Sequence, residues 1–133
     1  MRARIAFALW VAAAAVVLLE PSPAIATGTV HRTADLMAHA GLPAAICDPA
    51  HVEALLNAGM FLPPAALALL GWRTLRWADV AVFGFVGSFA VELTQALFFD
   101  ARSAQAIDVV ANTSGALAGA LLGEFARRRR RRA

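Results

Sequence analysis

The sequence predicts an all-α integral membrane protein, folded as a bundle of about four transmembrane helices. Of its 133 residues, 60% are hydrophobic and 16% are charged, whereas a soluble domain is about 45–50% apolar and about 25% charged. The apolar residues form four long segments, and most arginines lie at the ends of these segments. A small membrane domain accounts for all three observations, because a helix needs roughly 20 apolar residues to cross the hydrocarbon core.

Residues 1–26 have two interpretations. Ile5 to Leu19 is an unbroken apolar run after a start with two arginines. It is short for a transmembrane helix, but when Ala3 is counted it comes within reach of the lower limit of about 17 residues. The basic start, the apolar run and the small residues up to Ala26 also fit a secretory signal that is cleaved after Ala26. The bundle has four spans if the first helix is retained and three after cleavage.

Residues 27–53 are expected to form an extracytoplasmic loop. The stretch from Glu20 to Glu53 contains all three histidines and four of the six prolines, so it is too polar and too interrupted to cross a membrane. Within it, one short helix is expected from Thr33 to Ala40, because threonine is a good N-cap and the following Gly41 and Pro43 are typical of a helix end.

Residues 54–126 are expected to form a transmembrane core of three helices. The apolar segments run from Ala54 to Trp72, from Val80 to Phe99 and from Ile107 to about Phe125. Their connections are short, so consecutive helices should be antiparallel neighbours. Residues 127–133 follow as a cytoplasmic basic tail that contains six consecutive arginines.

Prolines and glycines indicate how the core helices pack. Pro63 and Pro64 lie in mid-span, where each ring removes a backbone donor, so a kink is expected and the carbonyls of Gly59 and Met60 are released. Glycines recur at four-residue spacing on the last helix, which allows another helix to approach closely. The residues expected to determine helix packing are Pro63, Gly115, Gly119 and Gly123.

The distribution of arginine predicts the orientation. If the N-terminus is cytoplasmic, 10 of the 12 arginines lie on the cytoplasmic side and only Arg32 and Arg102 lie outside. This asymmetry follows the positive-inside rule. Both termini are then cytoplasmic, or the new N-terminus is outside if the signal is cleaved.

Several polar residues lie inside the apolar segments or on their connection. Glu92 and Gln95 are i, i+3 neighbours and Asp108 and Asn112 are i, i+4 neighbours, so each pair shares one face of its helix. The helical rise places all of them in the outer half of the membrane, with Glu92 about 10 Å below the outer end of its helix. Ionisable residues at such depth are costly and usually functional. The expected ligand-binding residues are Asn57, Glu92, Gln95, Arg102, Asp108 and Asn112.

Other classes of site are not supported by the sequence. The histidines lack metal-ligand spacing, and Cys47 is the single cysteine, so neither a metal nor another cofactor is expected. The arginine tail is interpreted as a topology signal that binds anionic lipid, not as a nucleic-acid-binding motif. No span contains a histidine, and no catalytic residue is assigned.

The chain resembles the VanZ-like family of small bacterial membrane proteins, named for a teicoplanin-resistance accessory protein. The resemblance rests on Asn57 to Pro63, Glu92 to Gln95, Arg102 and Asp108 to Gly115, in this order and spacing. The positions that match the family are Asn57, Phe61, Pro63, Glu92, Gln95, Arg102, Asp108, Asn112 and Gly115. The chain departs from the family at Gln105, where members often have an acidic residue, and at Pro64 and Ala65, where a glycine often follows the proline.

The resemblance implies a multi-span protein of the bacterial cytoplasmic membrane, associated in some members with glycopeptide tolerance. The leading hypothesis is an outer pocket that binds a lipid head group or a lipid-linked wall precursor, with Arg102 holding an anionic group. Other hypotheses are an enzyme with Glu92 as general acid or base, a proton-coupled transport component, and a structural protein in a homo-oligomer or envelope complex. Membrane lipids are expected partners in each case.

Overall fold

The structure, a computed structural model, describes residues 1–18, 23–98 and 105–132, and within these ranges it contains five α-helices and no β-strand. The helices are α1 (Arg2–Leu18), α2 (Pro23–His39), α3 (Pro49–Gly71), α4 (Trp77–Phe98) and α5 (Ala106–Arg132). Among the described residues, the helices long and apolar enough to cross a membrane are Pro49–Gly71, Trp77–Phe98 and Ala106–Arg131. The predicted all-α membrane bundle is therefore confirmed.

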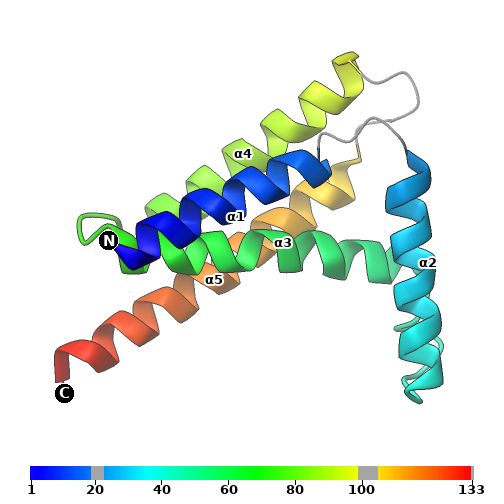
Figure 1. The fold of residues 1–133 in the computed structure, drawn as a ribbon, viewed down its shortest axis with the longest axis horizontal. Helices are drawn as coiled ribbons and strands as arrows, with labels where there is room; N and C mark the ends of the chain where they lie inside the picture. The colour runs from blue at the N-terminus through cyan, green and yellow to red at the C-terminus, as the bar shows by residue number, and fades with distance from the viewer. Residues whose placement is uncertain (19–22, 99–104, 133) are drawn as a thin grey trace.

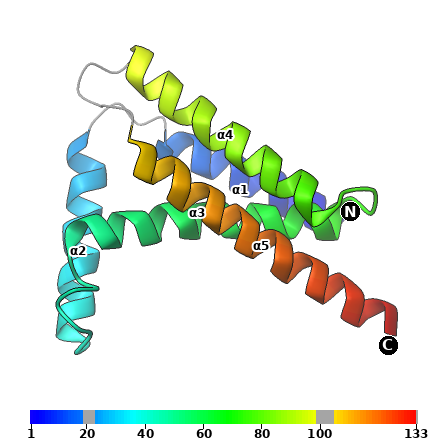
Figure 2. The same ribbon diagram turned by 180° about the vertical axis from the view of Figure 1, so that it is seen from behind.

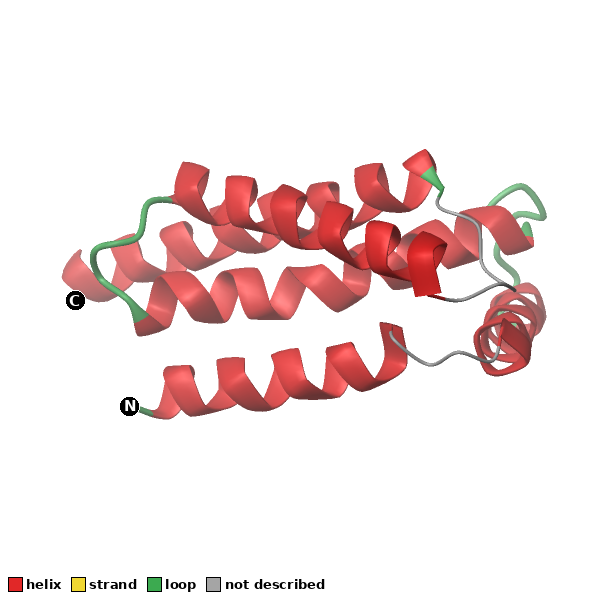
Figure 3. Ribbon diagram, turned by 90° about the horizontal axis from the view of Figure 1, so that it is seen from above, coloured by secondary structure: helices red, strands yellow, loops and turns green. Residues whose placement is uncertain are grey.

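α1, α3, α4 and α5 run along the bundle, whereas α2 lies across one end of it (Figures 1 and 3). The expected short helix from Thr33 to Ala40 was wrong in extent, because α2 already begins at Pro23. A proline in the first turn of a helix loses no hydrogen bond, so it does not interrupt the structure there. The buried Val30 and Ala34 of α2 then pack on Val52 of α3.

The first spanning helix of the core also begins earlier than expected. Its start is Pro49, and the preceding Asp48 is the N-cap, whose side chain accepts a hydrogen bond from the Ala50 N–H at 2.9 Å. A carboxylate at this position satisfies one of the unpaired donors of the first turn. Glu53, expected at the end of a loop, is therefore part of α3.

α5 packs against α3 through its stripe of glycines. The glycine and carbonyl pairs in contact are Gly115 with Ala58, Gly119 with Leu62 and Gly123 with Ala66. A Cβ atom added at Gly119 would lie 2.0 Å from the Leu62 carbonyl oxygen. Both series advance by four residues, so the two helices run in the same direction and their backbones meet once per turn. Such close approach allows Cα–H···O contacts and leaves no space for a side chain.

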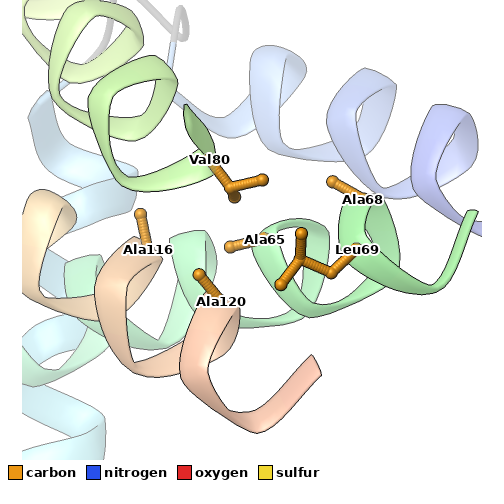
Figure 4. Packing of buried hydrophobic residues seen from close by; sticks show 6 residues of the cluster. All are labelled: Ala65, Ala68, Leu69, Val80, Ala116 and Ala120. Atoms are coloured by element: carbon orange, nitrogen blue, oxygen red, sulfur yellow. The ribbon is translucent and has the colours of Figure 1, made fainter. Parts of the chain in front are cut away.

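Small side chains also form the buried core between α3, α4 and α5 (Figure 4). The cluster consists of Ala65, Ala68, Leu69, Val80, Ala116 and Ala120. Many large apolar side chains point outward instead, and Phe83, Phe85 and Phe89 of α4 are at least half exposed. This reversal is expected for helices in lipid, where close backbone packing, rather than burial of large side chains, drives association.

The N-terminus, the connection between α3 and α4, and the C-terminal part of α5 meet at one end of the bundle, called here the arginine end (Figures 1 and 2). Arg4 Nε donates to the Gly71 carbonyl at 2.8 Å, and Arg127 Nη1 donates to the Leu75 carbonyl at 3.0 Å. Glu124 forms an ion pair with Arg127. The segments that carry most arginines are thus held together. That this end faces the cytoplasm stays a prediction.

α1 supplies hydrogen-bond partners to α3 and α4. Pro64 has no N–H for the Met60 carbonyl, and the indole N–H of Trp10 donates to that carbonyl at 2.9 Å. α3 continues as one helix through both prolines. At the other end of α1, the Leu18 carbonyl accepts a hydrogen bond from the Gln95 side chain at 2.6 Å. Cleavage of the first 26 residues would remove both partners, so these contacts favour a retained helix, which stays a prediction.

Candidate functional site

A cavity lies at the end of the bundle opposite the arginine end, where α1 and α4 end, α3 and α5 begin, and α2 crosses (Figure 1). This end is called the polar end. The cavity has a volume of about 570 Å³, within the range of roughly 300–1,000 Å³ that is usual for small-molecule sites. All five helices contribute to its lining.

The lining combines apolar and polar side chains, called here the apolar wall and the polar wall. α1 and α2 contribute mainly apolar side chains, among them Val16, Val17, Ile25 and Val30. α3, α4 and α5 contribute most of the polar side chains, which are Glu53, Asn57, Glu92, Gln95, Asp108 and Asn112. α2 also contributes Thr29, and α3 adds the apolar Leu55, Leu56 and Met60. An apolar lining with a few polar groups is typical of a ligand site.

Five of the six predicted ligand-binding residues line this cavity, namely Asn57, Glu92, Gln95, Asp108 and Asn112. The sixth, Arg102, lies outside the described residues, so its role as an anion-binding group stays a prediction. Helical spacing explains why the others meet, because i, i+3 and i, i+4 pairs on neighbouring helices turn their polar faces toward each other.

Asn57 and Asp108 connect α3 to α5. The Asn57 Nδ2 donates to Asp108 Oδ1 at 2.9 Å across the two helices. A hydrogen bond to a carboxylate is shorter and stronger than one between neutral groups. The bond fixes Asp108 at the start of α5, where the positive end of the helix dipole also favours a negative charge.

Glu92 connects α4 to the start of α5. Its side chain is 5% exposed, and Oε2 accepts a hydrogen bond from the backbone N–H of Gln105 at 2.9 Å. Gln105 immediately precedes α5, and the first N–H groups of a helix have no partner within the helix. Glu92 therefore has a structural role as well as a place in the cavity lining.

Asn112 is the most deeply buried polar residue of the lining. It is 1% exposed, and its Nδ2 donates to Oγ of the buried Ser88 at 2.9 Å. Within the described part of the chain, Asn112 Oδ1 is a buried side-chain atom without a hydrogen-bond partner. A buried polar atom of this kind calls for an explanation.

Sequence reasoning missed Glu53 and Ser88. Glu53 was placed in the loop because α3 was expected to begin at Ala54, although Asp48 followed by Pro49 is a readable helix start. Ser88 lies one turn before Glu92 on the same face of α4, so helical spacing could have included it. A single serine in an apolar segment gave no separate signal.

The polar side chains of the cavity can form hydrogen bonds and charge interactions with a ligand. No group of three or more His, Cys, Asp or Glu side chains that could hold a metal ion is found among the described residues. The polar wall offers carboxylates and amides, which bind through hydrogen bonds and charge. The apolar wall offers hydrocarbon surface to a ligand.

Comparison with known proteins identifies one family. The sequence profile of the family described as VanZ/LLP1 matches residues 6–127, which is most of the chain. The matched range includes α2, α3 and α4 in full and most of α1 and α5. No curated protein and no solved structure matches the chain significantly. The match covers all five described lining residues that the sequence had singled out.

Proposed function

This chain belongs to the VanZ/LLP1 family, and we propose that it is a cell-envelope membrane protein whose cavity binds the polar head of an amphiphile. The amphiphile is a membrane lipid or a lipid-linked wall precursor. The observation that carries the proposal is the cavity of about 570 Å³ with one apolar and one polar wall. A head group pairs with the polar wall while its chain contacts the apolar wall.

The proposed orientation places the cavity in the outer leaflet. Arg4 and Arg127 hold the arginine-rich segments together at the opposite end, and the positive-inside rule assigns such an end to the cytoplasm. The polar end then faces the outside of the cytoplasmic membrane, where wall precursors are used and where glycopeptides act. Binding a precursor there would change its access to teicoplanin.

The glycine stripe argues against a purely structural alternative. That alternative uses the glycine face of the last helix to join a larger envelope complex. In the structure this face is occupied by α3 of the same chain, because Gly115 and Gly119 meet the carbonyls of Ala58 and Leu62. A partner protein would need another surface.

Neutralising the cavity carboxylates is expected to abolish drug protection. Glu92→Gln and Asp108→Asn each keep an oxygen for the bond to Gln105 or Asn57 and remove the charge, so binding is lost while the fold is kept. The measurement is susceptibility to teicoplanin beside vancomycin, in cells with equal membrane levels of each variant. We expect the unaltered chain to protect the cells. Cells with either variant should be as susceptible as cells with the empty vector.

The control is Asp35→Asn, which removes a carboxylate from the exposed side of α2. It should protect as the unaltered chain does. Protection that persists in Glu92→Gln and Asp108→Asn, or that is absent from the unaltered chain, would contradict the proposed role in glycopeptide response.

A further inference from the structure

We infer that the cavity selects its amphiphile by a hydrogen-bond donor on the head group, which Asn112 Oδ1 receives. The inference rests on the proposed function, because it names the ligand chemistry of the same cavity. The donor is the N–H of an ammonium group or the O–H of a sugar. Both present a hydrogen to an oxygen acceptor, which a quaternary ammonium cannot do.

The position of Asn112 is the first reason. Its amide nitrogen is engaged by Ser88, which directs the amide oxygen away from that contact. Among the residues that the structure describes, this oxygen is buried without a hydrogen-bond partner, and Asn112 lines the cavity. Leaving a buried acceptor unsatisfied is unfavourable. A ligand that brings a donor removes this cost, whereas a ligand without one does not.

The remaining polar groups of the wall lead to the same conclusion. One N–H of the Asn57 amide already donates to Asp108, and one N–H of the Gln95 amide donates to the Leu18 carbonyl. Glu92 and Asp108 are carboxylates, which accept hydrogen bonds but do not donate them when ionised. Among the described residues, the ionised carboxylates of the polar wall thus match a head group that carries a donor.

The apolar wall completes the description of the ligand. Val16 and Val17 of α1 and Ile25 of α2 belong to the apolar lining of the cavity. Burial of a hydrocarbon chain there is favourable whatever the head group. The chain supplies affinity, and the head-group donor supplies selectivity.

Native mass spectrometry of the full chain tests the inference. The protein is purified in an amine-oxide detergent and offered equal amounts of phosphatidylethanolamine, phosphatidylcholine and a glucosyl diacylglycerol with identical acyl chains. The first has N–H donors, the second has none and the third has O–H donors. We expect at least one donor-bearing lipid to exceed phosphatidylcholine by about tenfold, the ratio that corresponds to about 1.4 kcal/mol. The lipid that binds more strongly than phosphatidylcholine shows whether the donor is an ammonium N–H or a sugar O–H.

Variants of Asn112 make the assignment specific. Asn112→Leu should bind the three lipids equally. Thr113→Val should keep the preference for a donor-bearing lipid, because the Thr113 hydroxyl donates to the Val109 carbonyl of its own helix. If Asn112→Leu does not fold, Asn112→Asp serves instead. Asn112→Asp keeps an acceptor and adds a negative charge, so it should bind phosphatidylethanolamine more strongly than the glucosyl lipid.

The outcomes separate the inference from the proposed function. Binding of phosphatidylcholine equal to both donor-bearing lipids would overturn the inference and leave the lipid-binding function standing. An unchanged preference in folded Asn112→Leu, or in Asn112→Asp where that variant serves instead, would also overturn the inference. If none of the three lipids forms an adduct, both the inference and the proposed lipid-binding function are overturned.

Discussion

Gly119→Ala is expected to destabilise the bundle by about 3 kcal/mol, a magnitude at the upper end of the usual cost of overpacking. The added methyl group would lie 2.0 Å from the carbonyl oxygen of Leu62. That oxygen belongs to the backbone of α3, so it cannot move aside as the end of a flexible side chain can. The two helices must separate, and the contacts of the neighbouring Gly115 and Gly123 weaken with them.

Gly87→Ala is the matched control for this prediction. An added Cβ at Gly87 meets nothing within 4 Å, and alanine raises helix propensity by about 1 kcal/mol at either position. The difference between the variants therefore reports packing alone. The measurement is the thermal unfolding midpoint in detergent, followed by circular dichroism. Equal midpoints for Gly119→Ala and Gly87→Ala would show that the α3–α5 contact is not as close as described.

The second large effect is expected at Glu92, where the leucine variant should be less stable than the glutamine variant. Glu92→Leu removes the acceptor for the Gln105 N–H at the start of α5, and loss of a hydrogen bond to a charged group costs about 1.5–3 kcal/mol. Glu92→Gln keeps an oxygen there and should lose less. The structural role of Glu92 can thus be separated from the role of its charge in binding.

Hydrogen exchange at the Gln105 amide measures this difference directly. The amide should be protected in the unaltered chain and in Glu92→Gln, and it should exchange faster in Glu92→Leu. Gln95→Leu is a suitable comparison, because Gln95 lies one turn away on the same helix and bonds to the Leu18 carbonyl instead. Equal exchange in all four proteins would mean that Glu92 does not hold the start of α5.

The transmembrane core was predictable because a membrane restricts the chain to helices. Length and hydropathy determine where spans occur, and the helical repeat determines which polar residues share a face. Asn57, Glu92 and Asp108 could therefore be assigned to one site before any contact was known. The four-residue spacing of glycines likewise predicted a close helix contact, though not which helix would supply it.

Other features depend on tertiary contacts that no local pattern reports. α2 extends from Pro23 because its apolar side meets Val52 of α3, a residue 29 positions later in the sequence. The Met60 carbonyl released by Pro64 accepts a hydrogen bond from the indole N–H of Trp10 of α1. The partner lies 50 residues away, so the sequence could show the released carbonyl but not what satisfies it.

Whether the cavity binds an amphiphile is tested most directly by filling it. An added Cβ at Gly59 meets nothing within 4 Å, as at Gly87, but Gly59 lines the cavity and Gly87 is not among its lining residues. Gly59→Leu and Gly87→Leu should therefore both fold, and only the first should obstruct a ligand. The measurement is native mass spectrometry of the full chain extracted from the membranes in which it is expressed. A lipid-sized adduct on the unaltered chain and on Gly87→Leu, but not on Gly59→Leu, is the expected result, whereas equal adducts on all three proteins would contradict binding in the cavity.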